Sequence, residues 1–193
     1  NILGFDNYYG RTEYDNDDDF DGTWGIWDEK FLNYTKEVMD KKEEPFFSTI
    51  FTVSSHEPYK IPKEYEGKFP IGNIQMHQCI GYTDYSFKMF FEAAKNEDWF
   101  DNTIFVITAD HGNQTDYIEY EQIINRTATP ILIYKPDNSL AEVKKDLAQQ
   151  IDVYPTLVDL IGYDQPFRSW GRSLINDTII TPFAINYGAS GYI

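Results

Sequence analysis

TIFVITADHGN, residues 103–113, is the stretch that decides the fold. Residues 103–108 are all β-branched or aromatic, which is typical of a strand buried on both faces of a parallel sheet. Polarity then arrives abruptly with Asp110 and His111. In open α/β sheets, ligands bind beyond the carboxyl ends of the strands. We therefore predict that Asp110 and His111 lie at a functional site.

A second stretch has the same character. Residues 45–53, PFFSTIFTV, have the composition of a buried strand and are followed by His56 within SSHEPY. If the two strands were parallel neighbours, His56 and His111 would stand at the same rim of the sheet. Neutral imidazoles there can bind a divalent metal or donate to an anionic oxygen. His77 has no such partner nearby in the sequence and is predicted to be structural.

The rest of the chain alternates between helical and strand-like patterns. The expected helices are residues 27–42, 76–98, 141–150 and 151–163, and the further expected strand is residues 129–136. The helix at 151–163 is predicted to begin at Asp152 as N-cap and to end at Gly162. This order predicts an α/β fold with a mainly parallel sheet and helices on both faces.

Composition restricts the function classes. The chain has 193 residues and a net charge of −16, from 32 acidic and 16 basic residues, which argues against a nucleic-acid partner and favours a cation. A hydrophobic fraction of 41% excludes a disordered chain. The single Cys79 permits no internal disulfide. No stretch approaches the roughly 18 apolar residues that span a membrane.

The chain begins with NILGFDNYYGR, without an initiator Met, and enters an aromatic segment at once. We therefore expect it to be a piece of a longer protein. On this expectation, the lack of a targeting signal says nothing about the whole protein.

An acidic stretch at residues 13–22 resembles a calcium-binding loop. Its acids match the EF-hand spacing D-x-D-x-D-G-x5-E, except that Asp replaces the last Glu. The matching positions are Asp17, Asp19, Asp21, Gly22 and Asp28. The preceding segment has the composition of turns rather than of an EF-hand helix. We predict a solvated acidic loop, with a Ca²⁺ site as the alternative.

Asp110 and His111 together offer one hard oxygen and one borderline nitrogen, which suits Mn²⁺, Zn²⁺ or Fe better than Ca²⁺. The sequence contains no G-x-S-x-G elbow, no Walker loop and no G-x-G-x-x-G fingerprint. Serine hydrolase, NTPase and dinucleotide-binding functions therefore lack support.

The order of several segments resembles a known family. The segments are WGIWDEKFL, PFFSTIFTVSSHEPY, IGYTDYSFKMFFEAAKNEDWFDNTIFVITADHGN, TPILIY, IDVYPTLVDLIGY and GRSLI. Together they resemble the carboxyl-terminal half of the sulfatase-like branch of the alkaline phosphatase superfamily, in particular lipoteichoic acid synthases and related phosphoglycerol transferases. The resemblance implies an incomplete sulfatase-like domain at residues 1–175 and the start of a small antiparallel β subdomain at residues 176–193.

The resemblance also implies a chemistry. Asp110 and His111 correspond to metal ligands, with Mn²⁺ expected first and Zn²⁺ or Ca²⁺ as alternatives. His56 corresponds to a catalytic, substrate-binding histidine that contacts the phosphoryl oxygens. The family's nucleophilic Thr and a ligating Glu belong to an amino-terminal half that this chain lacks, so we expect the chain alone to be inactive.

The implied substrate is an anionic phospholipid head group or another phosphate or sulfate ester of the cell envelope. The implied location is the extracytoplasmic face of a bacterial membrane, with attachment through a missing amino-terminal region. Two alternatives stay open: a true sulfatase or phosphodiester hydrolase, and a non-catalytic domain that binds an anionic ligand.

Overall fold

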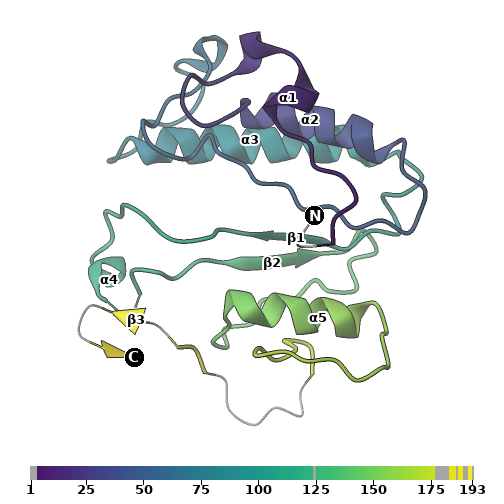
Figure 1. Cartoon of the computed structure of the whole chain (residues 1–193). Helices are drawn as coiled ribbons and strands as arrows, with labels where there is room; N and C mark the ends of the chain where they lie inside the picture. Colours follow the sequence, from purple (N-terminus) through teal and green to yellow (C-terminus); the bar gives the residue numbers. More distant parts are fainter. Residues whose placement is uncertain (1–3, 124, 177–182, 186, 189–190, 193) are drawn as a thin grey trace. The chain divides into compact units, whose positions relative to one another are not determined.

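The computed structural model describes residues 4–123, 125–176, 183–185, 187–188 and 191–192 (Figure 1). The chain divides into two compact units, residues 1–103 and residues 104–193. Each unit is described by itself below. Among the described residues, no helix combines the length and the apolar character needed to cross a bilayer.

Unit 1 is built on two packed helices, α2 (Asp28–Met39) and α3 (Met76–Ala94), which lie side by side in Figure 1. Both correspond to predicted helices, at residues 27–42 and 76–98, which are therefore confirmed. The shorter elements of this unit are α1 (Arg11–Tyr14), η1 (Asp17–Asp19) and η2 (Lys63–Tyr65).

The core of unit 1 draws most of its side chains from α3 and the residues that follow it, and half of its buried apolar residues are aromatic. Its buried apolar residues are Ile26, Leu32, Met39, Tyr65, Cys79, Tyr82, Phe90, Ala94, Trp99 and Phe100. The buried aromatic face of α3 is thus a packing surface. Burial of this apolar area is the main contribution to the stability of the unit.

The strand predicted at residues 45–53 is wrong. In the part of the chain that the structure describes, these residues form no strand. A strand exists only through ladder hydrogen bonds to a neighbour, and composition alone cannot supply that neighbour. At the end of this stretch, the backbone N–H groups of Val53 and Ser54 donate to the side-chain carboxylate of Asp28 rather than to a neighbouring strand.

Unit 2 contains the predicted strands at residues 103–109 and 129–136, as β1 (Phe105–Thr108) and β2 (Ile131–Tyr134). They pair antiparallel, with Phe105 opposite Tyr134 and Thr108 opposite Ile131. The prediction of parallel strands is therefore wrong for this pair. A parallel pair needs a long crossover, usually a helix, whereas α4 (Ile118–Glu121) between them is a single turn.

The α/β class is confirmed by the combination of this pair with α5 (Val153–Leu160). The α5 helix follows Asp152 as predicted, accommodates Pro155 in its first turn, and ends before Gly162, whose φ is +71°. A short turn, η3 (Gln150–Asp152), leads into it.

The helix predicted at residues 141–150 is wrong, because these residues are irregular up to η3. Its apolar positions stay largely exposed: Val143 is 86% exposed and Leu147 is 59% exposed. Short helices gain most of their stability from a packed apolar face, and this segment has none.

Near the end of the chain, β3 (Tyr187–Gly188) and β4 (Gly191–Tyr192) pair antiparallel. This agrees with the predicted antiparallel strands in this region. Residues 177–182 lie outside the described residues, and a domain boundary at residue 176 stays a prediction.

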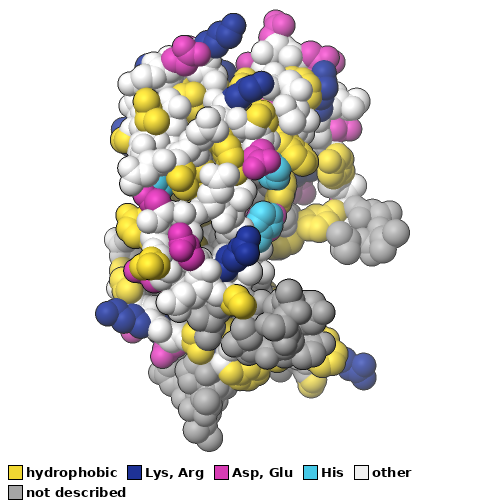
Figure 2. All heavy atoms as spheres, turned by 90° about the vertical axis from the view of Figure 1, so that its left-hand side faces the viewer, with side chains coloured by type: hydrophobic (Ala, Val, Ile, Leu, Met, Phe, Trp, Pro, Cys, Tyr) yellow, Lys and Arg dark blue, Asp and Glu magenta, His cyan; other side chains and the backbone are white. Residues whose placement is uncertain are grey.

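On the face shown in Figure 2, Lys and Arg side chains are dispersed singly among acidic and hydrophobic ones. The charge on this face is therefore of mixed sign, although the chain as a whole carries −16.

Candidate active site

Asp110 and His111 leave the end of β1 together, as the sequence predicted. Asp110 Oδ2 lies 3.6 Å from His111 Nε2, and Asp110 Oδ1 accepts the backbone N–H of His111 at 2.9 Å. The side chains are 61% and 57% exposed, respectively. A carboxylate oxygen and an imidazole nitrogen therefore stand next to each other, open to solvent.

The contact made by Nδ1 of His111 determines whether Nε2 can act as a metal ligand. His111 Nδ1 lies 2.8 Å from the carbonyl oxygen of Gly112. A carbonyl only accepts, so this contact assigns the proton to Nδ1 and leaves Nε2 with a free lone pair in the neutral ring. The same arrangement orients many metal-binding histidines.

The pair is held by contacts from three segments. Thr108 Oγ1 donates to the Pro130 carbonyl at 2.9 Å, next to β2. Gln150 Nε2 donates to the carbonyls of both Ala109 and Asp110 at 2.7 Å. A Cβ at Gly112 would stand 2.8 Å from the carbonyl oxygen of Arg126, so only glycine fits there without a shift.

The donor set of Asp110 and His111 fits part of a divalent metal site. The oxygen and the unprotonated Nε2 are ligand types that Mn²⁺ and Zn²⁺ accept. Among the described residues, no group of three or more His, Cys, Asp or Glu side chains gathers as a metal site would require. The pair therefore supplies two ligands rather than a complete coordination sphere.

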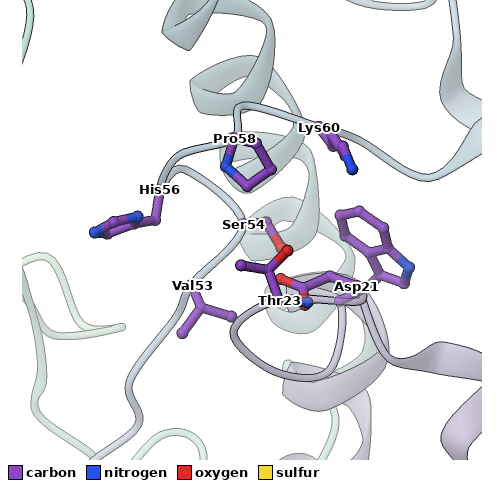
Figure 3. A pocket seen from close by; sticks show the side chains of 8 residues that line it. Asp21, Thr23, Val53, Ser54, His56, Pro58 and Lys60 are labelled. Atoms are coloured by element: carbon purple, nitrogen blue, oxygen red, sulfur yellow. The ribbon is translucent and has the colours of Figure 1, made fainter.

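His56 belongs to unit 1, so its surroundings are described separately from those of the pair. It lies in a turn in which its backbone N–H donates to the Val53 carbonyl at 3.1 Å. The ring is exposed, and Figure 3 shows it pointing away from Thr23 and Ser54. Nδ1 lies 3.1 Å from the carbonyl of Glu57, which again leaves Nε2 as the outward nitrogen.

A buried carboxylate anchors the turn that carries His56. Asp28 is 1% exposed, and its Oδ1 accepts the backbone N–H groups of Val53 at 2.8 Å and Ser54 at 3.0 Å. Its Oδ2 accepts the hydroxyl of Thr83 at 2.9 Å. In return, the Asp28 backbone N–H donates to Ser54 Oγ. One carboxylate thus connects α2, α3 and the turn.

The small hollow beside this turn has a volume of about 10 Å³, room for roughly one water molecule. Its lining residues are Asp21, Thr23, Trp27, Val53, Ser54, His56, Pro58 and Lys60 (Figure 3). It is too small to hold an ester substrate.

The acids of the calcium-loop motif are engaged by separate partners. Asp17 pairs with Arg11 at 2.6 Å, and Asp19 accepts the Tyr14 hydroxyl at 2.6 Å. Asp21 accepts backbone N–H groups of its own loop, and Asp28 points into the interior. This arrangement favours the predicted acidic loop over the Ca²⁺ alternative.

His77, predicted to be structural, accepts the backbone N–H of Asn73 on Nδ1 at 3.2 Å. No motif or periodicity in the sequence indicates the roles of Asp28 and Gln150. Asp28 was matched to a calcium motif, and Gln150 was placed in a helix that does not form. Only the folded chain brings Asp28 to the backbone of Val53 and Ser54, and Gln150 to the backbone of Ala109 and Asp110.

Comparison with known proteins assigns the family. The family model for sulfatases matches residues 2–163. The chain belongs to the sulfatase family. The resemblance predicted from the order of its segments is thereby confirmed.

Among curated members related to this sulfatase-family chain is the lipoteichoic acid synthase of Staphylococcus saprophyticus, 25% identical over 92% of this chain and 31% of that protein. Another is the lipoteichoic acid synthase-like YvgJ of Bacillus subtilis, 22% identical over 95% of this chain and 33% of that protein. The chain thus spans about a third of the length of these relatives.

Two solved structures are similar. One is a protein of the alkaline phosphatase superfamily from Vibrio parahaemolyticus, with a TM-score of 0.76 and 32% identity over 94% of this chain and 43% of that one. The other is the lipoteichoic acid synthase LtaP from Listeria monocytogenes, with a TM-score of 0.70 and 21% identity over 83% of this chain and 44% of that one. Both support the predicted alkaline phosphatase-like fold.

Proposed function

We propose that this chain forms part of the active site of a metal-dependent enzyme that transfers a phosphoglycerol or phosphoryl group, or hydrolyses the corresponding ester. The observation that carries the proposal is the exposed pair of Asp110 Oδ2 and His111 Nε2, 3.6 Å apart at the end of β1. Membership of the sulfatase family and similarity to lipoteichoic acid synthases support the choice of reaction.

Asp110 and His111 are proposed to hold the metal, with Mn²⁺ first and Zn²⁺ or Ca²⁺ as alternatives. Such an ion lowers the pKa of a coordinated hydroxyl and offsets negative charge on the group being transferred. The Gly112 carbonyl keeps the proton of His111 on Nδ1, so that Nε2 stays available as a ligand. The nucleophile and the remaining ligands are proposed to come from other parts of the full-length protein.

His56 is proposed to bind the substrate. Its Nδ1 faces the Glu57 carbonyl, so the protonated ring offers Nε2–H to an anionic oxygen of the ester. A fixed N–H donor of this kind stabilises charge that develops on the oxygen in the transition state. Asp28 supports this role by holding the backbone of the turn.

The proposed substrate is a phosphate ester of the cell envelope, such as an anionic phospholipid head group, met on the extracytoplasmic side of a bacterial membrane. Attachment to that membrane is proposed to come from a part of the full-length protein outside residues 1–193. The names of the relatives support this substrate class, since lipoteichoic acid is an envelope polymer. The family's name also favours a second candidate substrate, a sulfate ester.

The test is release of p-nitrophenol by the full-length protein from a phosphate monoester, a phosphate diester and a sulfate ester, with and without Mn²⁺. We expect Mn²⁺-dependent cleavage of a phosphate ester. Asp110→Ala should abolish metal binding and turnover, whereas His56→Ala should slow turnover and leave the metal bound. Asp146→Ala, which removes another exposed carboxylate of unit 2, is the matched control.

Other outcomes separate the alternatives. Cleavage of the sulfate ester alone would establish a sulfatase. No cleavage of any ester, with Mn²⁺ bound, would favour a domain that binds an anionic ligand without catalysis. Full turnover in Asp110→Ala, or loss of metal in His56→Ala, would show that the roles of these residues are misassigned.

A further inference from the structure

Trp24 occupies an unusual place for a tryptophan. It is 54% exposed, so the apolar core does not explain its position. Its ring lies against His56, with 4.1 Å between the ring centroids and an interplanar angle of 52°. Its Nε1–H donates to the carbonyl of Glu57 at 2.5 Å.

The Glu57 carbonyl therefore faces two ring nitrogens. It accepts from Trp24 Nε1 and lies 3.1 Å from His56 Nδ1. The carbonyl has two lone pairs and can accept from both. The indole thereby packs against the imidazole at a tilt and shares the acceptor that orients its Nδ1–H. A half-turn of the His56 ring about χ2 would place Cδ2 where Nδ1 now faces the Glu57 carbonyl, and contact with the indole opposes that rotation.

The loop that carries Trp24 is fixed by its own backbone. Asp21 Oδ1 accepts the N–H groups of Thr23 and Trp24, each at 2.7 Å, and that of Gly25 at 3.2 Å. The Asp21 N–H in turn donates to the Gly25 carbonyl at 2.9 Å. Such carboxylate-centred turns are stable local structures. Trp24 is therefore presented to His56 from a preformed loop.

We propose that Trp24 is a positioning residue that holds the His56 ring with Nδ1–H directed to the Glu57 carbonyl, so that in the protonated ring Nε2–H is the group offered to the substrate. The proposal deepens the substrate-binding role of His56 and rests on that proposed function for its importance in the reaction. It implies that Trp24 acts through His56 and need not touch the ester itself.

The first test is direct observation of the His56 tautomer by ¹⁵N NMR of the imidazole nitrogens, at a pH where the ring is neutral. The chain has three histidines, so His77→Gln and His111→Gln variants assign the signals. We expect wild-type His56 to carry its proton on Nδ1. Trp24→Ala should shift the ring toward the Nε2–H form that free histidine side chains favour, whereas Trp24→Phe, which keeps a ring at this place, should retain the Nδ1–H form.

Trp170→Ala is the matched control, because Trp170 is 95% exposed and lies in the other unit. It should leave the His56 signals unchanged. An unchanged His56 tautomer in Trp24→Ala overturns the inference. Thermal unfolding of each variant shows whether the fold is kept, and removal of an exposed side chain at Trp24 should leave the midpoint within a few degrees.

The second test uses turnover by the full-length protein. Trp24→Ala should lower kcat by about tenfold to a hundredfold with a smaller change in KM, as expected when a reacting group is misplaced. A shifted tautomer with unchanged turnover would leave the positioning contact established and overturn the proposed role of His56 in the reaction. An unchanged tautomer would overturn the positioning inference whatever the activity.

Discussion

The side-chain amide of Gln150 donates to the backbone carbonyl of Asp110 at 2.7 Å, and thus ties a residue 40 positions away to a proposed metal ligand. The same amide nitrogen reaches the Ala109 carbonyl at 2.7 Å. The direction in which the Asp110 carboxylate leaves the end of β1 therefore depends on the turn that precedes α5.

We expect Gln150→Ala to weaken Mn²⁺ binding by the full-length protein about tenfold, because contacts that orient ligands typically contribute tenfold to a hundredfold to affinity. Calorimetric titration with Mn²⁺ measures this directly. Gln165→Ala, at another exposed glutamine of unit 2, is the control and should bind as the wild type does. A Mn²⁺ affinity of Gln150→Ala equal to that of the wild type would show that the backbone of residues 109–110 keeps its conformation without the Gln150 amide.

Thr83→Val should destabilise unit 1 by about 1–2 kcal/mol, because the buried Asp28 carboxylate loses one of its donors and a polar atom is left unpaired. Asp28→Ala should cost about 3 kcal/mol or more, since it strands the N–H groups of Val53 and Ser54. Urea unfolding of the variants gives both values. Thr12→Val, at an exposed position in α1, should be near neutral, and a Thr83→Val as stable as the wild type would contradict the anchoring role.

Gly171→Ala should destabilise unit 2. A Cβ at this position would stand 2.1 Å from the carbonyl oxygen of Ile151, a backbone atom that cannot move aside alone. Forced overpacking of this kind typically costs about 1–3 kcal/mol. Hydrogen exchange at the amides of α5 reports on this region, and we expect faster exchange there. Exchange at the wild-type rate would mean that the backbone relaxes at little cost.

Stability should fall as the pH rises above about 9. Burial, with a smaller contribution from the nearby Asp28 charge, raises the pKa of the Cys79 thiol from 9.0 to about 11. Burial is also the main cause that raises the pKa of Tyr82 above its ordinary 10.0. In this range the unfolded chain releases protons that the folded chain keeps, so the unfolded state is favoured as the pH increases.

Thermal unfolding followed by circular dichroism from pH 7 to pH 11 checks this sign. The midpoint should be nearly flat below pH 9 and should decrease above it. Tyr82→Phe should reduce the slope above pH 10, where the unfolded tyrosine would otherwise ionise. A midpoint that rises over this range would contradict the assignment of these groups as buried and protonated.

The sequence was sufficient where the signal is local. The apolar spacing of α3, the Gly162 stop of α5 and the polar break after β1 are each encoded within a few residues, and all are found in the structure. The adjacent Asp110 and His111 could be predicted as a pair for the same reason. Motif order, which summarises many weak local signals, was enough to indicate the family.

The sequence was insufficient where a structure depends on contact with a distant segment of the chain. Residues 45–53 have strand composition but no strand among the described residues, and β1 pairs with β2 antiparallel because of how the intervening chain returns. The residues that support the site make contacts between distant parts of the sequence. Asp28 contacts Ser54, 26 positions away, and Gln150 contacts Asp110, 40 positions away. Trp24 likewise lies far in sequence from His56. No periodicity or motif marks contacts of that kind.

The anchoring of the His56 turn has a consequence for how specificity in this protein can vary. Asp28 holds the turn through the backbone N–H groups of Val53 and Ser54, which every amino acid except proline possesses. The side chain of Val53 is not part of that anchor, although it lines the hollow beside His56. Position 53 is therefore a place where substitutions can reshape the surroundings of His56, the proposed substrate-binding histidine, while the backbone of its turn stays anchored.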